Sequence, residues 1–390
     1  MKSKKSFVTV FTDTENFHLV KDVGQIPYFM YRAGAYEAEL VTYRNSPEYP
    51  YLKDEVKGLK LSFIENTGRV LYAEKGVLKF LRSAAKRIDV LNLFHFKKGN
   101  ILYLLLYKIL NPQGKAYVKL DIDLNFFRDY NSFFYSKFVL KNYLLKVLTQ
   151  VHFRLTDLFS VETEEARNYL LGVYPELKQK LICVPNGVDS EYINSNISLK
   201  SFEQKENIII SVGRIGTAQK NTELFLESLL LTDLGNWSVY IAGNIEDSFK
   251  PFRESFFARH PRLKDKIFFT GEISDRKELY ELYNRAKVFC MTSRFEGFPI
   301  AFAEASYFGN YIISTPVSSA SYVTGNGRLG TVAEARPEAV SAAISKAISE
   351  GFLDADLHLE IKNFAGLNLT WQKIVRRIIS YFDKHAKTAA

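Results

Sequence analysis

The sequence predicts an α/β fold made of two domains with mainly parallel sheets. Its 390 residues exceed the roughly 150 residues typical of one domain. In both halves short apolar runs alternate with segments of helical periodicity, a rhythm typical of parallel strands covered by helices. A polar stretch without a periodic apolar face separates the halves. We therefore expect a first domain over residues 1–190, a linker over 191–206 and a second domain over 207–370.

The first half is the less regular one. Its apolar runs predict strands, and its 3.6-residue periodicity predicts helices between them. A terminal amphipathic helix over residues 371–390 is expected to pack back onto this first domain. The predicted strands are residues 7–12, 39–43, 89–95, 116–122 and 157–161, and the predicted helices are 77–87, 132–151 and 162–171.

The second half restarts with a continuous apolar run at residues 207–213, which predicts a strand buried on both faces. The remaining strands and helices alternate after it. The predicted strands are residues 237–242, 267–270, 288–292 and 311–314, and the predicted helices are 222–230, 276–285, 300–308 and 337–349.

Composition excludes several classes of protein. Hydrophobic residues make up 47% and charged residues 24%, which supports full-sized cores and argues against disorder. The net charge of +9 suggests anionic partners, among which nucleotide, nucleic acid and anionic membrane all stay open. The two cysteines, Cys183 and Cys290, lie in apolar stretches, so we expect neither a disulfide framework nor a cysteine metal cluster.

The start of the chain and its most apolar run indicate in which cellular compartment the protein is expected. The first apolar run ends after Phe11 and acidic residues follow, so it reads as a strand and not as a signal peptide. Residues 101–107 are apolar, but Lys108 ends the run far short of the ~20 residues that a membrane span needs. We expect a cytoplasmic protein, with peripheral association at the inner face of the plasma membrane left open.

The segment from Ser211 to Lys220, SVGRIGTAQK, leads from a predicted strand through a glycine-containing loop to a helix. Loop amides and helix N-termini attract phosphate, and Arg214 and Lys220 could neutralise a diphosphate as a metal ion would. The alternative is a pair of solvated basic residues beside a loop.

A second segment, EGFPIAFAE, places Glu296 and Glu304 on either side of a strand-to-helix turn. Both carboxylates can then face a pocket at the carboxyl edge of the sheet, where open α/β sheets bind ligands. Ionised carboxylates accept hydrogen bonds from vicinal hydroxyls, and the amides of residues 297–300 can hold an anion. The alternative is a surface acid beside an acid that complements a helix dipole.

Residues 207–314 closely resemble glycosyltransferase family 4, a group of GT-B fold enzymes. The resemblance is carried by SVGRIGTAQK, by IAGN at 241–244, by FTGEIS at 269–274 and above all by EGFPIAFAE, which matches the E-x7-E motif of that family. LFSVETEEAR at 158–167 and CVPNGVD at 183–189 also look like family segments. The implied fold is two Rossmann-like domains that face each other across a cleft.

The resemblance implies a retaining transferase that moves a hexose or N-acetylhexosamine from a nucleotide sugar, with UDP preferred, to a glycan, lipid-linked or protein acceptor. Such an enzyme would serve cell-surface polysaccharide or glycoconjugate synthesis, and neither metal nor further cofactor is expected. By position, Arg214 and Lys220 would hold the donor diphosphate, Glu304 the ribose and Glu296 the donor sugar. The residues expected around the sugar, phosphates and base are Gly297, Phe298, Pro299, Ile300, Gly271 and Glu272.

The first half departs from the family pattern in two places. Where relatives often carry a Gly-Gly loop, this chain has the single Gly24, a weaker candidate for contact with the donor. The strand at 116–122 lacks the histidine that many relatives place toward the acceptor. His95 at the end of another predicted strand is the nearest substitute, followed by Asp121 and Asp123, with a structural histidine as the alternative.

Other patterns in the sequence favour different functions, with weaker support. Asp121-Ile-Asp123 spells the D-x-D pattern of metal-dependent GT-A enzymes, but so short a pattern recurs by chance. The stretch 79–108 mixes basic with apolar residues and could rest on an anionic membrane, or simply present basic solvent faces. No nucleic-acid-binding module is recognisable.

Two further classes concern the chain as a whole. A nicotinamide-dependent dehydrogenase would need a G-x-G-x-x-G turn after the first strand, which residues 11–16 do not supply. A non-catalytic GT-B-like partner that binds glycan or protein stays the alternative function. Nothing in the sequence fixes the oligomeric state.

Overall fold

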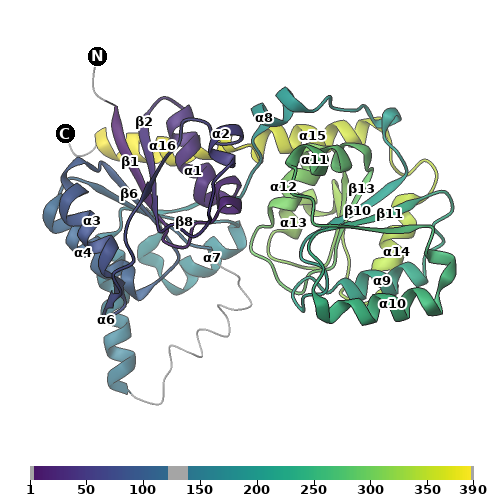
Figure 1. Cartoon of the computed structure of the whole chain (residues 1–390), viewed down its shortest axis with the longest axis horizontal. Helices are drawn as coiled ribbons and strands as arrows, with labels where there is room; N and C mark the ends of the chain where they lie inside the picture. The colour runs from purple at the N-terminus through teal and green to yellow at the C-terminus, as the bar shows by residue number, and fades with distance from the viewer. Residues whose placement is uncertain (1–3, 122–138, 388–390) are drawn as a thin grey trace. The chain divides into compact units, whose positions relative to one another are not determined.

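The computed structural model describes residues 4–121 and 139–387 (Figure 1). The chain divides into two compact units. The first combines Met1–Asn186 with Trp371–Ala390, and the second is Gly187–Thr370. Each unit is a parallel sheet with helices on both faces, as the alternation of strands and helices predicts.

The sheet of the first unit has seven strands in the order β3-β2-β1-β6-β7-β8-β9. Every pair of neighbours is parallel. Strand order reverses beside β1, which creates the switch point at which open α/β sheets bind ligands. The strands are β1 (Lys5–Val10), β2 (Tyr36–Thr42), β3 (Lys60–Phe63), β6 (Val90–Phe94), β7 (Lys115–Lys119), β8 (Leu158–Val161) and β9 (Leu181–Cys183).

Helices cover both faces of this sheet and bury a separate apolar core on each. One core gathers side chains of α3, α4, α6 and α7, and the other gathers those of α1 and α16. The helices are η1 (Asn16–Val20), α1 (Asp22–Arg32), α2 (Tyr51–Asp54), α3 (Lys75–Ala84), η2 (Ala85–Arg87), α4 (Lys98–Leu110), α6 (Val139–Leu155), α7 (Glu164–Val173), η3 (Pro175–Leu177) and α16 (Trp371–Lys387).

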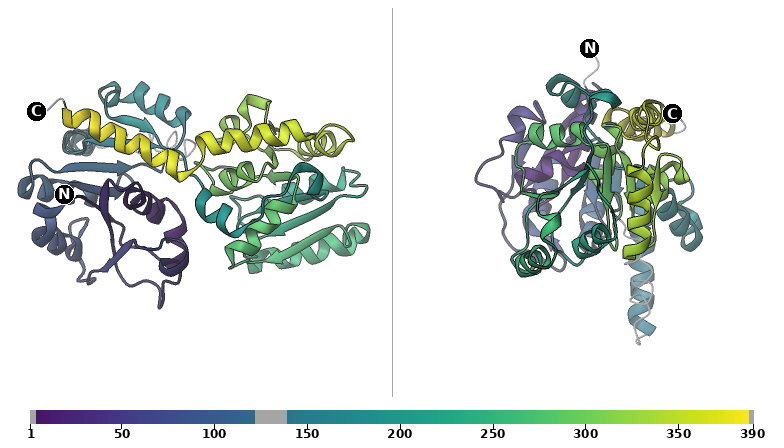
Figure 2. Two further views of the ribbon diagram at one scale, coloured as in Figure 1. Left: turned by 90° about the horizontal axis from the view of Figure 1, so that it is seen from above. Right: turned by 90° about the vertical axis from the view of Figure 1, so that its right-hand side faces the viewer.

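The terminal helix α16 lies beside α1 in the first unit (Figures 1 and 2). Trp371, Ile374 and Ile378 are buried in the core that α1 also lines. The hydroxyl of Tyr381 donates a hydrogen bond of 2.7 Å to the carbonyl of Asp157, which precedes β8. The last helix of the chain therefore completes the first unit.

A small antiparallel hairpin leads into α3. It pairs β4 (Arg69–Val70) with β5 (Ala73–Glu74), and Leu71 and Tyr72 form the two-residue turn between them. The register pairs Arg69 with Glu74 and Val70 with Ala73.

The second unit has a six-stranded parallel sheet in the order β12-β11-β10-β13-β14-β15. The run Ile208–Val212 is the third strand of this order, with a strand on each side, which explains its continuous apolar character. The strands are β10 (Ile208–Val212), β11 (Ser238–Ala242), β12 (Ile267–Gly271), β13 (Val288–Met291), β14 (Tyr311–Ser314) and β15 (Gly330–Val332).

Two helical layers sandwich this sheet, with α9, α10 and α14 on one face and α11, α12, α13 and α15 on the other (Figure 1). The helices are α8 (Ser190–Asn196), η4 (Phe202–Gln204), α9 (Thr222–Leu230), η5 (Asp247–Phe249), α10 (Lys250–Arg259), η6 (Pro261–Leu263), α11 (Arg276–Arg285), α12 (Ile300–Tyr307), α13 (Ala320–Val323), η7 (Gly325–Gly327), α14 (Pro337–Ile348) and α15 (Ala355–Asn368).

Residues 191–206, the predicted linker, lie within the second unit and form α8 and η4. Ile193 and Ile197 are buried in its core, four positions apart. The ammonium group of Lys205 is also buried and donates to the carbonyls of Tyr283, Asn284 and Ala286 at 2.7–3.2 Å. Much of its anchoring is polar, as in the hydrogen bonds of Ser198 and Lys200 with the side chain of Asn284, so no apolar periodicity marked this segment.

Several other elements differ from the sequence prediction. The apolar run at 101–107 is part of α4, which covers the first sheet. Strands β9 and β15 have three residues each, too few for a periodic signal, and β3 has no fully buried residue, so none of the three was predicted. Parts of the predicted strand 116–122 and helix 132–151 lie outside the described residues. Across residues 4–121 and 139–387 no helix combines the length and apolar character needed to cross a bilayer.

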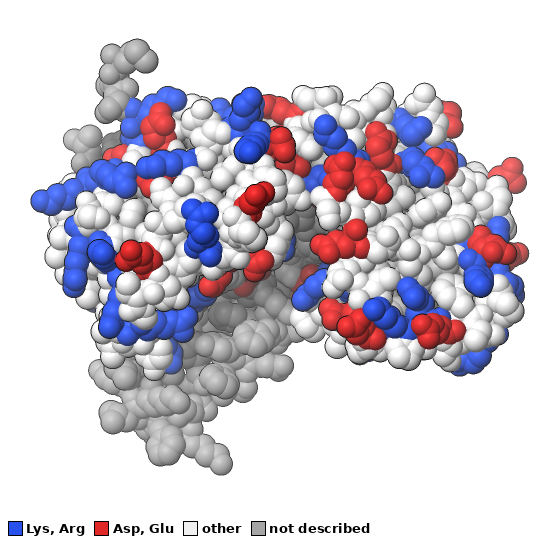
Figure 3. Space-filling model, in the orientation of Figure 1, with Lys and Arg blue, Asp and Glu red and all other residues white. Residues whose placement is uncertain are grey.

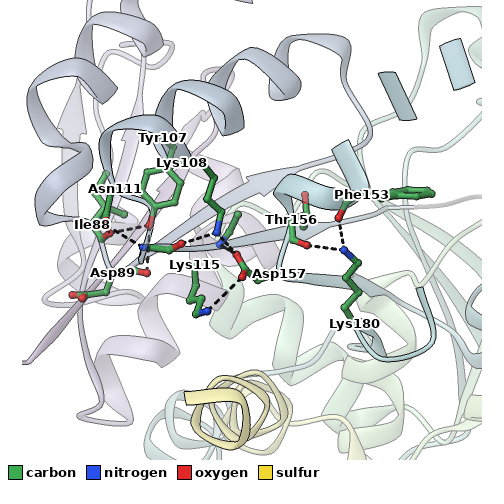
Figure 4. A network of polar contacts seen from close by, with 12 residues as sticks. Ile88, Asp89, Tyr107, Lys108, Asn111, Lys115, Phe153, Thr156, Asp157 and Lys180 are labelled. Carbon is green, nitrogen blue, oxygen red and sulfur yellow. Dashed lines mark hydrogen bonds and ion pairs between the residues drawn. The ribbon is translucent and has the colours of Figure 1, made fainter. Parts of the chain in front are cut away.

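A network of polar contacts lies at the amino ends of β7 and β8 (Figure 4). Lys108 of α4 donates to a carboxylate oxygen of Asp157 at 2.6 Å, and Lys115 lies 3.6 Å from the other oxygen. Tyr107 donates to the carbonyl of Ile88 at 2.9 Å. These contacts tie α4 to the amino edge of the sheet, so the opposite, carboxyl edge is the place to look for a ligand site.

Candidate functional site

The carboxyl ends of β10 and β13 meet at a small pocket in the second unit. The segment 211–220, which was predicted to bind phosphate, lines this pocket, whereas on the β13 side the lining ends at Ser293, before the predicted sugar segment 296–304. The hydroxyl oxygen of Ser293 is buried there without a hydrogen-bond partner among the described residues, which leaves it available to a ligand. The lining residues are Ser211, Val212, Gly213, Arg214, Ile215, Lys220, Thr222, Phe225, Ile241, Met291, Thr292 and Ser293.

Lys220 and Glu296, the cation and carboxylate of the two predicted segments, contact each other directly. The ammonium nitrogen lies 2.6 Å from Oε1 of the carboxylate. The side chains expose only 19% and 10% of their surface, so the pair is shielded more than an ordinary surface pair. The loop after β10 carries Lys220 and the loop after β13 carries Glu296, so the two loops bring opposite charges to the same point.

The two loops are also joined by a chain of hydrogen bonds. Arg214, which is exposed, donates to the side-chain oxygen of Gln219 at 3.0 Å, and the amide nitrogen of Gln219 donates to the carbonyl of Phe295 at 3.1 Å. Arg294 donates to the side-chain oxygen of Asn221 at 3.0 Å. These bonds fix the position of both loops before any ligand binds, which is the preorganisation that binding sites require.

Glycines make the site compact. Gly243 has a φ of 142°, and a Cβ atom there would lie 1.8 Å from the carbonyl oxygen of Gly213. A Cβ at Gly213 would lie 3.0 Å from Cε of Lys220, so the lack of a side chain at Gly213 lets the lysine side chain pack over its backbone. Gly271, which ends β12, accepts a hydrogen bond of 2.8 Å from the amide of Gly243.

Glu304 does not join Lys220 and Glu296 but pairs with Arg276 of α11, a residue that the sequence prediction missed. A guanidinium nitrogen of Arg276 lies 3.4 Å from Oε1 of Glu304, and the two side chains expose 15% and 6% of their surface. Burial raises the pKa of Glu304, and the charge of Arg276 acts in the opposite direction. The carboxylate stays one helical turn inside α12, as predicted, but it has a partner of its own.

The turn between the two glutamates begins α12. Pro299 occupies the N-cap position and Ile300 begins the helix, so the first backbone N–H groups are directed out of the helix start. Phe298 is buried in the core with its ring 6.3 Å from that of Tyr322, and only its backbone can face a ligand. Gly297 is partly exposed, whereas Glu272 after β12 is exposed to solvent.

In the first unit a second charged cluster lies at the carboxyl edge of the sheet. Lys119, the last residue of β7, is fully buried, and its ammonium nitrogen lies 2.7 Å from carboxylate oxygens of both Asp22 and Glu162. Asp22 begins α1 and Glu162 follows β8. Asn186 donates a further hydrogen bond of 2.8 Å to Glu162.

Electrostatics explain how this cluster is tolerated in the interior. Burial alone would lower the pKa of Lys119, but the Asp22 and Glu162 charges outweigh it and raise that pKa well above its usual value. The pKa of Asp22 is lowered, because the effect of Lys119 exceeds the cost of its burial. Burial and the neighbouring carboxylates raise the pKa of Glu162.

His95 follows β6 beside this cluster and has a left-handed backbone with a φ of 61°. Burial lowers the pKa of His95, although Asp121 raises it, so the imidazole is neutral near pH 7. Asp121 is exposed, and Asp123 lies outside the described residues. Gly24 lies inside α1, where a Cβ atom would be 2.3 Å from the carbonyl of Leu19; its lack of a side chain is required by the packing of its own unit.

The sequence prediction missed the residues whose partners are remote. Lys119 stands in an ordinary strand pattern, and its partners are 97 positions before it and 43 after it. Arg276 opens α11 directly after the Asp275 cap and looks like a surface residue in sequence. The only local signal was a lysine inside an otherwise apolar strand, since lysine is almost never fully buried without a partner.

Known proteins resemble this chain in sequence and in fold. Residues 195–364, which include the pocket and both glutamates, match the model of the family described as Glycosyl transferases group 1. The chain is 24% identical over 229 residues to a probable sucrose-phosphate synthase of Thermosipho melanesiensis. That match covers 57% of this chain and 52% of that protein, so the chain spans about half the length of this relative.

A second relative comes from Campylobacter jejuni and is named GalNAc-alpha-(1->4)-GalNAc-alpha-(1->3)-diNAcBac-PP-undecaprenol alpha-1,4-N-acetyl-D-galactosaminyltransferase. The identity is 31% over 120 residues, which covers 30% of this chain and 31% of that protein. Among solved structures, Anabaena Alr3699/HepE in complex with UDP and glucose superimposes with a TM-score of 0.70 at 13% identity, covering 97% of this chain and all of the other. The chain therefore has the GT-B fold of two Rossmann-like domains, and its residues 195–364 match the family described as Glycosyl transferases group 1.

Proposed function

We propose that this chain is a retaining glycosyltransferase of family 4 that transfers a hexose or N-acetylhexosamine from a nucleotide sugar. The acceptor is a glycan, lipid-linked or protein molecule, and the product belongs to cell-surface polysaccharide or glycoconjugate synthesis. The observation that carries the proposal is the meeting of Lys220 and Glu296 at 2.6 Å beside Arg214, at the carboxyl edge of the second sheet. Such a site combines cations for a diphosphate with a carboxylate for sugar hydroxyls.

The charges assign roles to the donor-site residues. Arg214 and Lys220 neutralise the negative charge that develops on the leaving diphosphate, which lowers the barrier most where water is excluded. No metal ion is needed in this scheme, because two cations already act on the leaving group. Glu296 accepts hydrogen bonds from the donor sugar, and Lys220 moves from that carboxylate to the phosphate when the donor binds.

Glu304 binds the ribose in this proposal, and Arg276 holds its carboxylate in place. The backbone amides of residues 297–300 at the start of α12 bind phosphate or sugar, and Gly271 and Glu272 lie toward the base. The departing phosphate accepts the proton of the acceptor hydroxyl, so that bond breaking and bond formation occur on one face of the sugar. UDP is the proposed nucleotide, and the UDP complex of the Anabaena relative supports this choice.

The first unit supplies the acceptor side of the proposal. His95, neutral near pH 7 and fixed in a left-handed backbone, is the candidate that contacts the acceptor. A lipid-linked acceptor finds support in the undecaprenol-linked substrate named for the Campylobacter jejuni relative. A cytoplasmic location with peripheral contact at an anionic membrane, through the basic stretch 79–108, completes the proposal.

Thermal unfolding tests the donor site. UDP, GDP and ADP and their sugar conjugates are added to the full chain, first without and then with divalent metal. A ligand that binds the native state at a hundredfold excess over its Kd stabilises it by about 2.7 kcal/mol and raises the midpoint. We expect one nucleotide to do so without metal, and Lys220→Ala to abolish the shift.

Lys250→Ala is the matched control, because Lys250 also forms a 2.6 Å ion pair in the second unit but lies on the exposed α10. It should keep the nucleotide shift. If no nucleotide or nucleotide sugar raises the midpoint, the donor site is refuted and a non-catalytic GT-B-like partner that binds glycan or protein becomes the better description.

A further inference from the structure

The turn of the β4–β5 hairpin exposes three consecutive apolar side chains. Leu71 exposes 78% of its surface, Tyr72 65% and Val70 42%. No other large apolar side chain among the described residues is as exposed as Leu71. Single exposed apolar residues are normal on a protein surface, but a contiguous group marks a contact site.

The backbone of Leu71 makes this exposure more informative. Its φ is 52°, in the left-handed region that two-residue hairpin turns usually fill with glycine, asparagine or aspartate. A turn that only had to reverse the chain would use one of those residues. Leu71 instead combines an unfavourable backbone with a solvated side chain, and within the described residues it belongs to no apolar core.

The tip is held in place by its base. The amide of Glu74 donates a hydrogen bond of 2.6 Å to the hydroxyl of Tyr103, which is buried in α4. A Cβ atom at Gly99 would lie 2.5 Å from the carbonyl of Tyr72, so the hairpin packs closely on the start of α4. The apolar side chains are therefore presented on a fixed support.

Positive charge surrounds the tip. The ammonium group of Lys98 lies 4.9 Å from the centre of the Tyr72 ring. Arg69 and Lys75 are exposed on either side of the turn residues, and Arg69 also lies 3.4 Å from the carboxylate of Glu74 at the base of the hairpin. Figure 3 shows further Lys and Arg side chains over the part of the first unit where α3 and α4 lie.

The apolar surface continues along α4. Leu105 exposes 41% and Ile109 66% of its surface, and they follow Lys98 by seven and eleven positions. At 3.6 residues per turn these three residues lie on one face of the helix. The exposed side chains of Leu105 and Ile109 thus form an apolar stripe along α4 that begins near Lys98, beside the β4–β5 hairpin.

We propose that the β4–β5 tip is a docking site for an anionic lipid bilayer, into which Leu71 and Tyr72 insert while Lys98, Lys75 and Arg69 contact the headgroups. A stable protein interface needs about 800 Å² on each partner, more than a two-residue turn offers. Insertion into a bilayer needs only apolar side chains and flanking cations. This inference rests on the proposed function, in which the acceptor is lipid-linked and would be reached at a membrane.

Vesicle flotation of the full chain tests this site. The probes are vesicles of phosphatidylcholine alone and of phosphatidylcholine with phosphatidylglycerol in equal parts. Leu71→Asn combined with Tyr72→Ser removes the apolar tip while asparagine tolerates the left-handed backbone, so the variant should fold. We expect it to lower binding to the anionic vesicles about a hundredfold, because each of the two apolar side chains withdrawn from the bilayer accounts for about tenfold.

Leu367→Asn is the matched control, since Leu367 lies on α15 of the second unit and exposes 67% of its surface. It should bind vesicles like the native chain. Lys75→Glu with Lys98→Glu should weaken binding to anionic vesicles about thirtyfold or more, at ~1 kcal/mol for each cation lost, and reduce its dependence on salt.

Two results would overturn the docking site: equal flotation of the native chain and the tip variant, or no flotation of the native chain with anionic vesicles. Self-association that is lost in the tip variant would point to a protein partner instead. The nucleotide-dependent midpoint separates this proposal from the donor site. The tip variant should keep that shift, and vesicle binding without any nucleotide shift would refute the proposed function alone.

Discussion

The ammonium nitrogen of Lys220 lies 2.6 Å from Oε1 of Glu296, although 76 residues separate them in the sequence. The lysine precedes α9 and the glutamate follows β13, so the pair joins the two loops that leave neighbouring parallel strands. In the proposed function a donor molecule has to separate this pair, because its diphosphate and its sugar compete for the two charges.

This competition predicts different effects for the two partners. Lys220→Met should lower both affinity for the bound nucleotide and kcat/KM, the latter by about a hundredfold or more, as for the loss of one donor to a developing charge. Glu296→Gln should lower kcat while binding free UDP at least as tightly, because Lys220 no longer has a carboxylate partner. Titration calorimetry with UDP measures the first effect and initial rates the second. Equal loss of UDP affinity in both variants would contradict these roles.

Glu304→Ala should destabilise the second unit as well as impair turnover. The side chain of Arg276 exposes only 15% of its surface, so the substitution leaves a mostly buried guanidinium without its carboxylate partner. Breaking a buried pair from one side costs about 3 kcal/mol. Urea unfolding should show this loss, and Glu304→Gln should recover part of it because the amide oxygen still accepts a hydrogen bond. An unchanged urea midpoint in Glu304→Ala would show that the pair contributes little.

Gly243→Ala should distort the donor pocket. The new methyl group would lie 1.8 Å from the carbonyl oxygen of Gly213, against which Lys220 packs. We expect loss of the nucleotide-dependent rise in midpoint together with a lower midpoint of the free protein. Gly366→Ala is the control, because that glycine lies within α15 with no atom within 4 Å of its Cβ position. It should raise stability by up to ~1 kcal/mol.

Lys119→Met should strongly destabilise the first unit. It leaves Asp22 and Glu162 buried at the end of β7 without their shared cation, at a cost of about 3–5 kcal/mol. Lys115→Met on the same strand is the control, since that side chain is 41% exposed and should cost less than ~1 kcal/mol. Urea unfolding followed by circular dichroism compares them. Similar midpoints for the two variants would mean that the buried triad adds no stability.

His152 should make the first unit sensitive to acid. Burial lowers the pKa of His152 to about 4 from 6.5, and neither ring nitrogen has a hydrogen-bond partner among the described residues. The unfolded chain therefore takes up the proton first. Stability is complete above pH 6.5 and falls between pH 6.5 and about 4, by about 1.4 kcal/mol per pH unit.

His152→Phe removes the titrating group and keeps an aromatic ring against Phe96 and Phe159. Urea midpoints measured between pH 7 and 5 should lose much of their slope in this variant. A slope identical to that of the native chain would assign acid sensitivity to other groups.

Much of the second unit could be predicted from the sequence. A continuous apolar run identified β10, and helical periodicity identified α9 and α11, because each of these signals depends only on residues close together in the sequence. The spacing of Glu296 and Glu304 placed one on the loop and one inside α12, as the structure has them. What that spacing could not show is that Glu304 faces Arg276 and not Lys220.

By itself, the sequence determined the parallel α/β architecture, the strand-to-helix loops at the candidate site of the second unit and the charged residues that those loops carry. The tertiary structure alone decided which charges meet. It set Lys119 between Asp22 and Glu162, brought α16 to α1 and gave Leu71 its exposed, left-handed position. The reason is physical: backbone propensity and apolar periodicity act over a few neighbouring residues, whereas ion pairing and burial depend on strand order and helix packing, which bring distant segments together.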